Sequence, residues 1–147
     1  EERRAKAQTG TIPIDKLKDM IKDYSGEDMD KDIPDKYTIS TKMWESAIRR
    51  KENNRKRGYG FGYSLFNQNS EYTSTISARY YKDGSEIWID QGEKTPRMLT
   101  PNEARKLQGF PEGFVIPVSD LQAYKQFGNS VSVPVIRAIA EKIVNFL

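Results

Sequence analysis

A short polar turn, Phe127-Gly128-Asn129-Ser130-Val131, stands directly before an apolar stretch that begins at Pro134. Glycine adopts backbone conformations that other residues avoid, so Gly128 predicts a tight turn with a strained φ. Asn129 and Ser130 then offer donors and acceptors beside the free N–H groups of a helix start, where anionic or polar ligands bind. By itself, such a turn is more often a plain capped helix start than a ligand site.

A second group of residues with chemical potential is basic. Residues 49–57 hold six basic side chains, whereas the net charge of the whole chain is only +3. A concentrated basic run favours a polyanionic partner, and a solvated helix face is an equally open alternative. The residues concerned are Arg49, Arg50, Lys51, Arg55, Lys56 and Arg57.

Cysteine and histidine are both absent from the sequence. Without cysteine there is neither a disulfide nor a thiolate metal site, and without histidine the commonest metal ligand and general base is missing. We therefore expect no metal. No apolar stretch approaches the roughly 18 residues of a membrane span, and no signal peptide is visible at the N-terminus. These absences predict a cytoplasmic protein without membrane contact.

The N-terminal half of the sequence predicts two helices. Apolar residues recur at helical spacing over residues 14–24, and an acidic, turn-rich linker follows over residues 25–34. A second helix is predicted over residues 41–57, with Thr41 as its cap and Gly58 at its end.

The middle of the chain predicts β-structure. Residues 73–81 are rich in β-branched and aromatic types, and residues 86–90 alternate polar with apolar side chains. Together they predict a hairpin whose turn lies at Asp83-Gly84, followed by a loop over residues 92–96.

Three short helices are predicted in the last fifty residues. Thr100 and Glu103 have the spacing of a capping box, and Ser119 and Gln122 repeat that spacing. The third helix opens at Pro134. Its apolar residues form one stripe at helical spacing: Val135, Ile136, Ile139, Ala140, Ile143, Val144 and Leu147.

Two adjacent segments resemble the ninth and tenth motifs of cytosine-C5 DNA methyltransferases. The ninth motif is matched by Arg97-Met98-Leu99-Thr100-Pro101-Asn102-Glu103-Ala104-Arg105-Lys106-Leu107-Gln108-Gly109-Phe110-Pro111. The tenth is matched by Gln122-Ala123-Tyr124-Lys125-Gln126-Phe127-Gly128-Asn129-Ser130-Val131. In that family the tenth motif lines the S-adenosyl-L-methionine pocket, so the resemblance assigns cofactor contacts to Asn129, Ser130 and Val131. The ninth motif braces the target-recognition domain, and Arg97 is our candidate structural organiser; a surface arginine on a loop is the alternative.

Residues 58–88 resemble the target-recognition domain of the same family, through Thr75-Ile76-Ser77-Ala78-Arg79-Tyr80. Their chemistry suits DNA. Thr75 and Ser77 can donate to phosphates, and Arg79 can donate to guanine O6 and N7. The backbone of the glycine-aromatic loop at residues 59–63 can approach a groove closely. Four further basic residues are candidate phosphate contacts: Lys82, Arg55, Lys56 and Arg57. A β-hairpin with outward polar residues is the alternative.

A complete member of that family also has a glycine-rich cofactor loop, a Pro-Cys pair and a Glu-Asn-Val segment, none of which occurs in this sequence. Because the nucleophile must be a thiolate, methyl transfer by this chain alone is excluded, and no catalytic residue is expected here. The resemblance implies an α+β fold: a small hairpin-based target-recognition domain flanked by short helices. The C-terminal helix would pack on a Rossmann-like catalytic domain absent from this chain.

These expectations divide the chain into three parts: an N-terminal helix and linker (1–38), a target-recognition domain with the ninth motif (39–121), and the tenth motif with its helix (122–147). The expected function is DNA target recognition and completion of the S-adenosyl-L-methionine pocket in a restriction-modification type DNA (cytosine-5-)-methyltransferase. The expected partners are double-stranded DNA, at the bacterial nucleoid, and a catalytic half or subunit that carries the Pro-Cys nucleophile. The alternatives are a stand-alone DNA-binding module and an inactive fragment.

Overall fold

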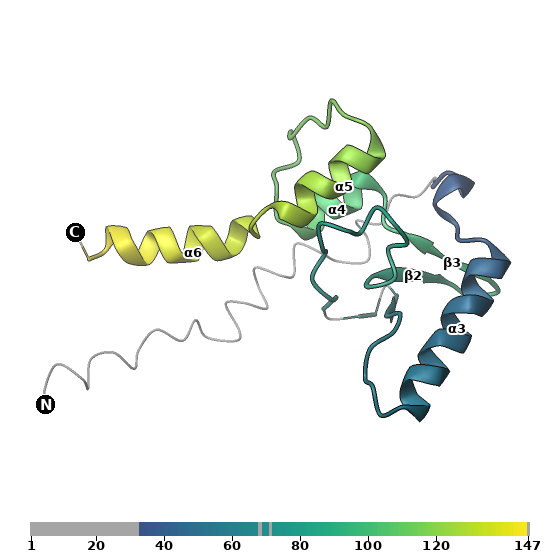
Figure 1. Cartoon of the computed structure of the whole chain (residues 1–147). Helices are drawn as coiled ribbons and strands as arrows, with labels where there is room; N and C mark the ends of the chain where they lie inside the picture. Colours follow the sequence, from purple (N-terminus) through teal and green to yellow (C-terminus); the bar gives the residue numbers. More distant parts are fainter. Residues whose placement is uncertain (1–32, 68, 71, 147) are drawn as a thin grey trace, which may run out of the picture.

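A computed structural model of the chain describes residues 33–146 apart from Gln68 and Glu71 (Figure 1). The helix expected over residues 14–24 lies outside these residues. The described elements, in chain order, are η3 (Asp35–Tyr37), α3 (Thr41–Lys56), β1 (Leu65–Phe66), β2 (Trp88–Gln91), β3 (Lys94–Met98), α4 (Pro101–Leu107), α5 (Asp120–Asn129) and α6 (Val133–Val144). The expected α+β class is confirmed.

The strands form one three-stranded sheet in the order β1-β2-β3. β1 runs parallel to β2, with Leu65 opposite Trp88, and β3 runs antiparallel to β2, with Met98 opposite Trp88. An isolated bridge between Thr38 and Arg97 brings the segment before α3 to the outer side of β3. Proline has no N–H to donate, but β3 is an edge strand and Pro96 uses only its carbonyl there. That carbonyl accepts a hydrogen bond from the Ile39 N–H.

The predicted hairpin is wrong in its position. The hairpin is formed by β2 and β3, with its turn at Gly92, whose φ is +70° and whose N–H donates to the Asp90 side chain. Asp83-Gly84 does turn the chain, but residues 72–77 before it are not part of a strand. The reason lies in Tyr80, which is fully buried and donates its hydroxyl to the Ile87 carbonyl. Core packing thus overrides the β-propensity of this segment.

The helix boundaries follow local sequence signals closely. Ser40, one residue before the predicted Thr41, caps α3 by accepting a hydrogen bond from the Met43 N–H, and Gly58 ends the helix at a φ of +80°. The capping box of α4 is confirmed. The second box is wrong, because Ser119 stands at the N-cap of α5 without a side-chain hydrogen bond.

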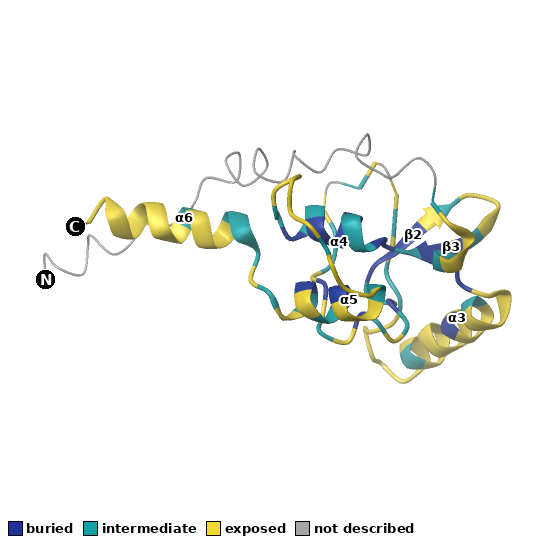
Figure 2. Cartoon of the chain, turned by 90° about the horizontal axis from the view of Figure 1, so that it is seen from above, coloured by how far each residue is buried: buried dark blue, intermediate teal, exposed yellow. Residues whose placement is uncertain are grey.

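The core consists of two clusters, one beside α3 and the other beside α4 and α5 (Figures 1 and 2). A small cluster of Ile39, Ala47 and Trp88 holds α3 against the sheet. The larger cluster joins the sheet to α4 and α5 and contains Ile76, Tyr80, Ile87, Ile89, Leu99, Ala104, Ala123, Tyr124 and Phe127. In contrast, α6 extends away from this body and contains no buried residue.

Candidate nucleic-acid and cofactor interface

Arg97 lies buried in β3 and makes a two-pronged ion pair with Glu103 of α4. Its Nη1 lies 2.7 Å from Glu103 Oε2, and its Nη2 lies 2.8 Å from Oε1. Glu103 is fully buried, and its Oε2 also accepts the Thr100 N–H at 2.8 Å, which is the reverse half of the capping box. One carboxylate therefore starts α4 and joins it to the sheet. Arg97 is not a surface arginine; its role as organiser stays a prediction that this geometry supports.

Two buried tyrosines link the same junction to α5. The Tyr80 hydroxyl donates to the Ile87 carbonyl and accepts the Leu99 N–H at 2.8 Å, while the Tyr124 hydroxyl donates to the Leu99 carbonyl. Burial raises the pKa of both hydroxyls above the usual tyrosine range, so both stay protonated and able to donate. These hydrogen bonds could not be predicted from the sequence, because nothing local to either tyrosine indicates its distant partner.

Gly128, in the tenth motif, is needed for close packing and not for the strained φ that the sequence predicts. Gly128 lies within α5 and does not have a positive φ. A Cβ atom at this position would lie 2.1 Å from the Ser77 carbonyl oxygen and 2.6 Å from the Ala78 nitrogen. Only glycine allows such a close approach. The backbone of the loop expected to read DNA therefore rests directly on the last turn of α5.

The turn expected to contact the cofactor follows at once. Asn129 ends α5 and is exposed, Ser130 is half-buried, and Val131 is exposed. The Ser130 hydroxyl donates to the Phe127 carbonyl at 2.7 Å, so it already has a partner within the chain. The structure thus leaves the side chains of Asn129 and Val131 at the surface of a fixed turn.

Gln108, after α4, holds this turn in place from both sides. Its side-chain amide donates to the Phe127 carbonyl at 2.7 Å, and its own carbonyl accepts the Val133 N–H at 2.9 Å. A Cβ atom at Gly109 would lie 2.3 Å from the Pro134 ring. The start of α6 is therefore also in close contact with the end of α4. The ninth and tenth motifs therefore form one packed joint.

The loop with four of the expected DNA contacts exposes all four. Thr75, Ser77, Arg79 and Lys82 are each exposed. The Ser77 hydroxyl donates to the Glu86 carboxylate and accepts the Arg79 N–H at 3.2 Å. Ser77 therefore shapes the loop, and the Glu86 partner was not foreseen because nine residues separate the two.

The basic triplet Arg55-Lys56-Arg57 is exposed at the C-terminal end of α3. Lys56 has an ion-pair partner one helical turn away, since its Nζ lies 3.2 Å from a Glu52 oxygen. Earlier on α3, Arg50 lies 3.7 Å from Asp83, which directly follows Lys82. The structure therefore brings the middle of α3 to the end of the recognition loop, and the triplet lies farther along the same helix.

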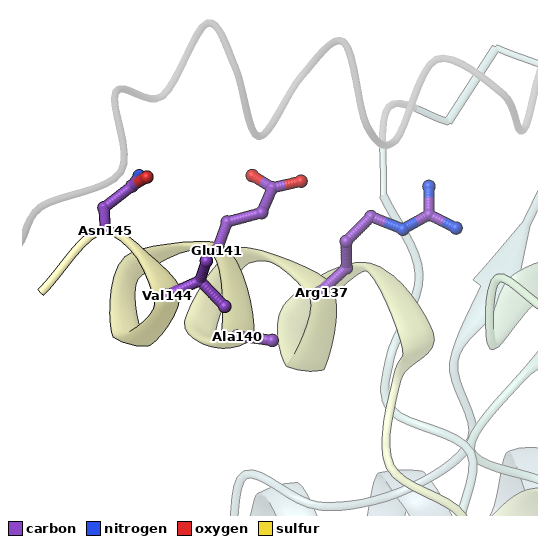
Figure 3. Close-up of a pocket in the computed structure, with 5 residues that line it drawn as sticks. All are labelled: Arg137, Ala140, Glu141, Val144 and Asn145. Atoms are coloured by element: carbon purple, nitrogen blue, oxygen red, sulfur yellow. The ribbon is translucent and has the colours of Figure 1, made fainter. Parts of the chain in front are cut away.

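The apolar stripe of α6 is exposed from Val135 to Val144, and Leu147 lies outside the described residues. The exposed fraction rises from 44% at Val135 to 69% at Val144, and Phe146 just beyond the helix is 91% exposed. An open hollow of about 420 Å³ also lies along α6 (Figure 3). Its polar side chains, Arg137, Glu141 and Asn145, stand four residues apart on one side of the helix. In the part of the chain that the structure describes, nothing covers the stripe.

Among the described residues, no group of three or more His, Cys, Asp or Glu side chains has an arrangement able to hold a metal ion. Among the same residues, every helix is too short or too polar to cross a lipid bilayer.

Known proteins similar to this chain are DNA methyltransferases. The family model of C-5 cytosine-specific DNA methylases matches residues 2–145. The chain is 67% identical over 115 residues to the type II methyltransferase M1.ScrFI of Lactococcus lactis subsp. cremoris, a match that covers 78% of this chain and 30% of that protein. It is 61% identical over 122 residues to the type II methyltransferase M.DsaV of Dactylococcopsis salina, covering 83% of this chain and 35% of the relative. The chain thus spans about a third of these relatives.

Solved structures share the fold. A mutant DNMT2 of Spodoptera frugiperda superimposes with a TM-score of 0.62 at 19% identity, covering 79% of this chain and 40% of that one. The S. pombe Dnmt2 methyltransferase superimposes with a TM-score of 0.61 at 15% identity, covering 82% of this chain and 41% of that one. At such identities the likeness establishes the fold alone.

Proposed function

The chain belongs to the family of C-5 cytosine-specific DNA methylases, and on this premise we propose that it performs DNA target recognition and completes the S-adenosyl-L-methionine pocket of a restriction-modification type DNA (cytosine-5-)-methyltransferase. One observation carries the proposal. The backbone of the Thr75–Lys82 loop rests on Gly128, and the Asn129–Val131 turn begins at the next residue. A loop proposed to read DNA, lying against the residue that precedes a turn proposed to bind the cofactor, is the arrangement that an enzyme acting on both substrates requires.

On the DNA side, the exposed polar groups divide into two sets. Arg79, with a guanidinium able to donate two hydrogen bonds to guanine, is the proposed base-reading residue. Thr75, Lys82 and the basic triplet (Arg55, Lys56, Arg57) are exposed and are the proposed phosphate contacts. Ser77 supports the loop through Glu86 and is a weaker candidate for direct contact.

On the cofactor side, the chain offers an amide and an apolar side chain on a fixed turn. Asn129 can hydrogen-bond polar groups of S-adenosyl-L-methionine, and Val131 can pack on its apolar surface. Ser130 fixes the turn through the Phe127 carbonyl. The residues present therefore fit one wall of the pocket. The cofactor, when bound, supplies the methyl group; these residues bind and orient it.

The rest of the pocket and the nucleophile must come from another part of the enzyme. The chain contains no cysteine, and the thiolate that attacks cytosine therefore belongs to a catalytic half, either a separate subunit or another stretch of the same polypeptide. We propose that α6 docks on that half. Each large apolar side chain of its stripe would gain about 1.5–3 kcal/mol on full burial. A stand-alone DNA-binding module would leave this stripe uncovered, and no observation favours it.

DNA binding by the purified chain tests the recognition role. Arg79→Ala should lower affinity for the cognate sequence by about 1–3 kcal/mol while leaving affinity for unrelated duplexes almost unchanged. Arg55→Gln with Arg57→Gln should lower affinity for every duplex and flatten the dependence of affinity on salt. Fluorescence anisotropy with labelled duplexes of several sequences, at a series of salt concentrations, measures both effects.

The cognate site is first found by selecting duplexes from a random pool with the wild-type chain. If both variants lose affinity equally for all sequences, the proposed division between base reading and phosphate contact is wrong. If the wild-type chain binds no duplex at low salt, the recognition role itself is wrong.

A further inference from the structure

The loop Gly58-Tyr59-Gly60-Phe61-Gly62-Tyr63, which we call the aromatic loop, uses its three rings in two different ways. Tyr63 turns inward, stacks on Trp88 at a centroid distance of 5.7 Å and meets the edge of Trp44 at 4.8 Å. Tyr59 and Phe61 turn outward and are 53% and 64% exposed. They stack on each other with centroids 5.2 Å apart and planes 19° apart. Core packing accounts for Tyr63 and leaves the outer pair unexplained.

The main chain of the aromatic loop is fastened to α3. The Asn54 side-chain amide donates to the Phe61 carbonyl at 3.1 Å, and the Asn54 carbonyl accepts the Tyr59 N–H at 2.9 Å. Lys51 donates to the Tyr63 carbonyl at 2.9 Å. A Cβ at Gly62 would lie 2.7 Å from the Lys51 side chain, so glycine is what lets the loop lie this close to the helix. The two outer rings are therefore held out from a supported backbone.

The surroundings of the outer rings are basic. The loop leaves α3 directly after Arg55, Lys56 and Arg57, and all three are exposed. Single exposed apolar side chains are ordinary on protein surfaces. A stacked pair of rings, preformed and adjacent to exposed cations, is the combination with which proteins bind nucleic acid whose bases are accessible: the cations meet phosphates and the rings stack on base faces.

We propose that Tyr59 and Phe61 form a stacking surface for a DNA base displaced from the duplex, beside phosphates bound by Arg55 and Arg57. The inference rests on the proposed DNA-binding function and adds a contact to it. Side chains of the aromatic loop, and not only its backbone, would contact DNA. Because every base has a π-face, this contact is independent of sequence.

The test compares two labelled duplexes of one sequence: one fully paired, the other with a single base opposite an abasic site, which is free to leave the stack. We expect wild type to bind the second duplex more tightly. Tyr59→Ala with Phe61→Ala should weaken binding to the duplex with the unpaired base by about tenfold and binding to the paired duplex far less. The dependence of affinity on salt should stay as in wild type, because no charge is removed.

Two controls make the result specific. Tyr72→Ala removes another exposed tyrosine and should affect neither duplex. Tyr59→Leu with Phe61→Leu keeps apolar side chains without rings and should behave like the alanine variant, and its urea unfolding midpoint should match that of wild type.

Equal affinities of the wild-type and alanine-variant chains for the unpaired-base duplex would overturn the inference. So would an equal loss on both duplexes, or a loss of binding to a catalytic half with DNA binding intact, which would make the pair a protein contact. In these outcomes the wild-type chain still binds DNA. If wild type binds neither duplex, the proposed function fails and the inference fails with it.

Discussion

Helices α5 and α6 are consecutive in the sequence but differ in burial. α5 buries Ala123, Tyr124 and Phe127 between the sheet and α4. α6 has an equally clear apolar stripe, but none of its residues is buried. The body of the molecule supplies a partner for α5, and the described residues supply none for α6. An amphipathic sequence therefore indicates that a helix packs against something. Only the burial of its apolar residues shows whether the partner surface belongs to this chain.

The proposed functional regions differ in the same way, one being packed within the chain and the other exposed. The α4–α5 joint is packed and internally hydrogen-bonded, and it fixes both the recognition loop and the cofactor turn. α6 follows this joint, and its apolar stripe packs against nothing in the described residues. If the account is right, substitutions in the joint should destabilise the chain, and substitutions on the α6 stripe should affect only assembly with the catalytic half.

Arg97→Ala should have the largest effect. It leaves Glu103 buried without its cationic partner, and breaking one side of a buried ion pair costs about 3–5 kcal/mol. Urea unfolding measures the loss. The control is Arg137→Ala on α6, which is exposed and should change stability by no more than about 0.5 kcal/mol. A similar effect of the two substitutions would remove the distinction between joint and α6.

Phe127→Ala and Ile139→Ala compare one apolar residue from each helix. The first removes a buried ring and should cost about 3–5 kcal/mol. The second removes an exposed side chain and should change the free energy of unfolding by about 0.5 kcal/mol or less. Denaturation in urea gives both values. A large loss for Ile139→Ala would show that α6 packs within this chain, contrary to the account.

Gly128→Ala should cost an intermediate amount. The new methyl group meets the Ser77 carbonyl, and overpacking of this kind costs about 1–3 kcal/mol, although alanine is otherwise favoured in a helix. Thermal unfolding measures the change, with Gly113→Ala as the matched control because a Cβ there meets nothing within 4 Å. Equal stability of the two variants would mean that the recognition loop does not rest on α5.

Asp120→Asn should have the smallest effect. Hydrogen bonds from Lys36 and then Tyr37 lower the pKa of the Asp120 carboxyl below its usual value near 3.8. The stabilisation is therefore fully present above that value and is lost as the pH falls through the lowered pKa. Unfolding followed between pH 6 and about pH 2 should show this loss in wild type and not in Asp120→Asn. Because the Lys36 and Asp120 side chains are 59% and 42% exposed, an effect as large as that of Arg97→Ala would contradict the structure.

Features set by neighbouring residues could be predicted from the sequence. The Thr100–Glu103 capping box and the α6 stripe are examples, because each depends on spacing within one helix. The hairpin was misplaced because Asp83-Gly84 and Gly92 both make turns, and the choice between them depends on the burial of Tyr80.

The sequence names the candidate site residues, whose binding roles stay predictions, but it does not indicate the contacts that hold them in place. The capping spacing revealed Glu103, yet its pairing with Arg97 depends on where β3 lies relative to α4. Gly128 was expected to need an unusual φ, and it needs space beside Ser77 instead. Such contacts join segments far apart in the sequence, which local patterns cannot specify.

The central claim is that this chain provides recognition and part of the cofactor pocket to a catalytic half that carries the thiolate. The most direct test mixes the chain with the portion of a relative such as M1.ScrFI that the match does not cover, which the account expects to carry the cysteine. The measurement is the transfer of a labelled methyl group from S-adenosyl-L-methionine to duplex DNA. The account predicts transfer by the mixture, none by either part alone, and a strong reduction with Ile139→Asp on α6. Transfer by the 147-residue chain alone, or no transfer and no complex in the mixture, would contradict it.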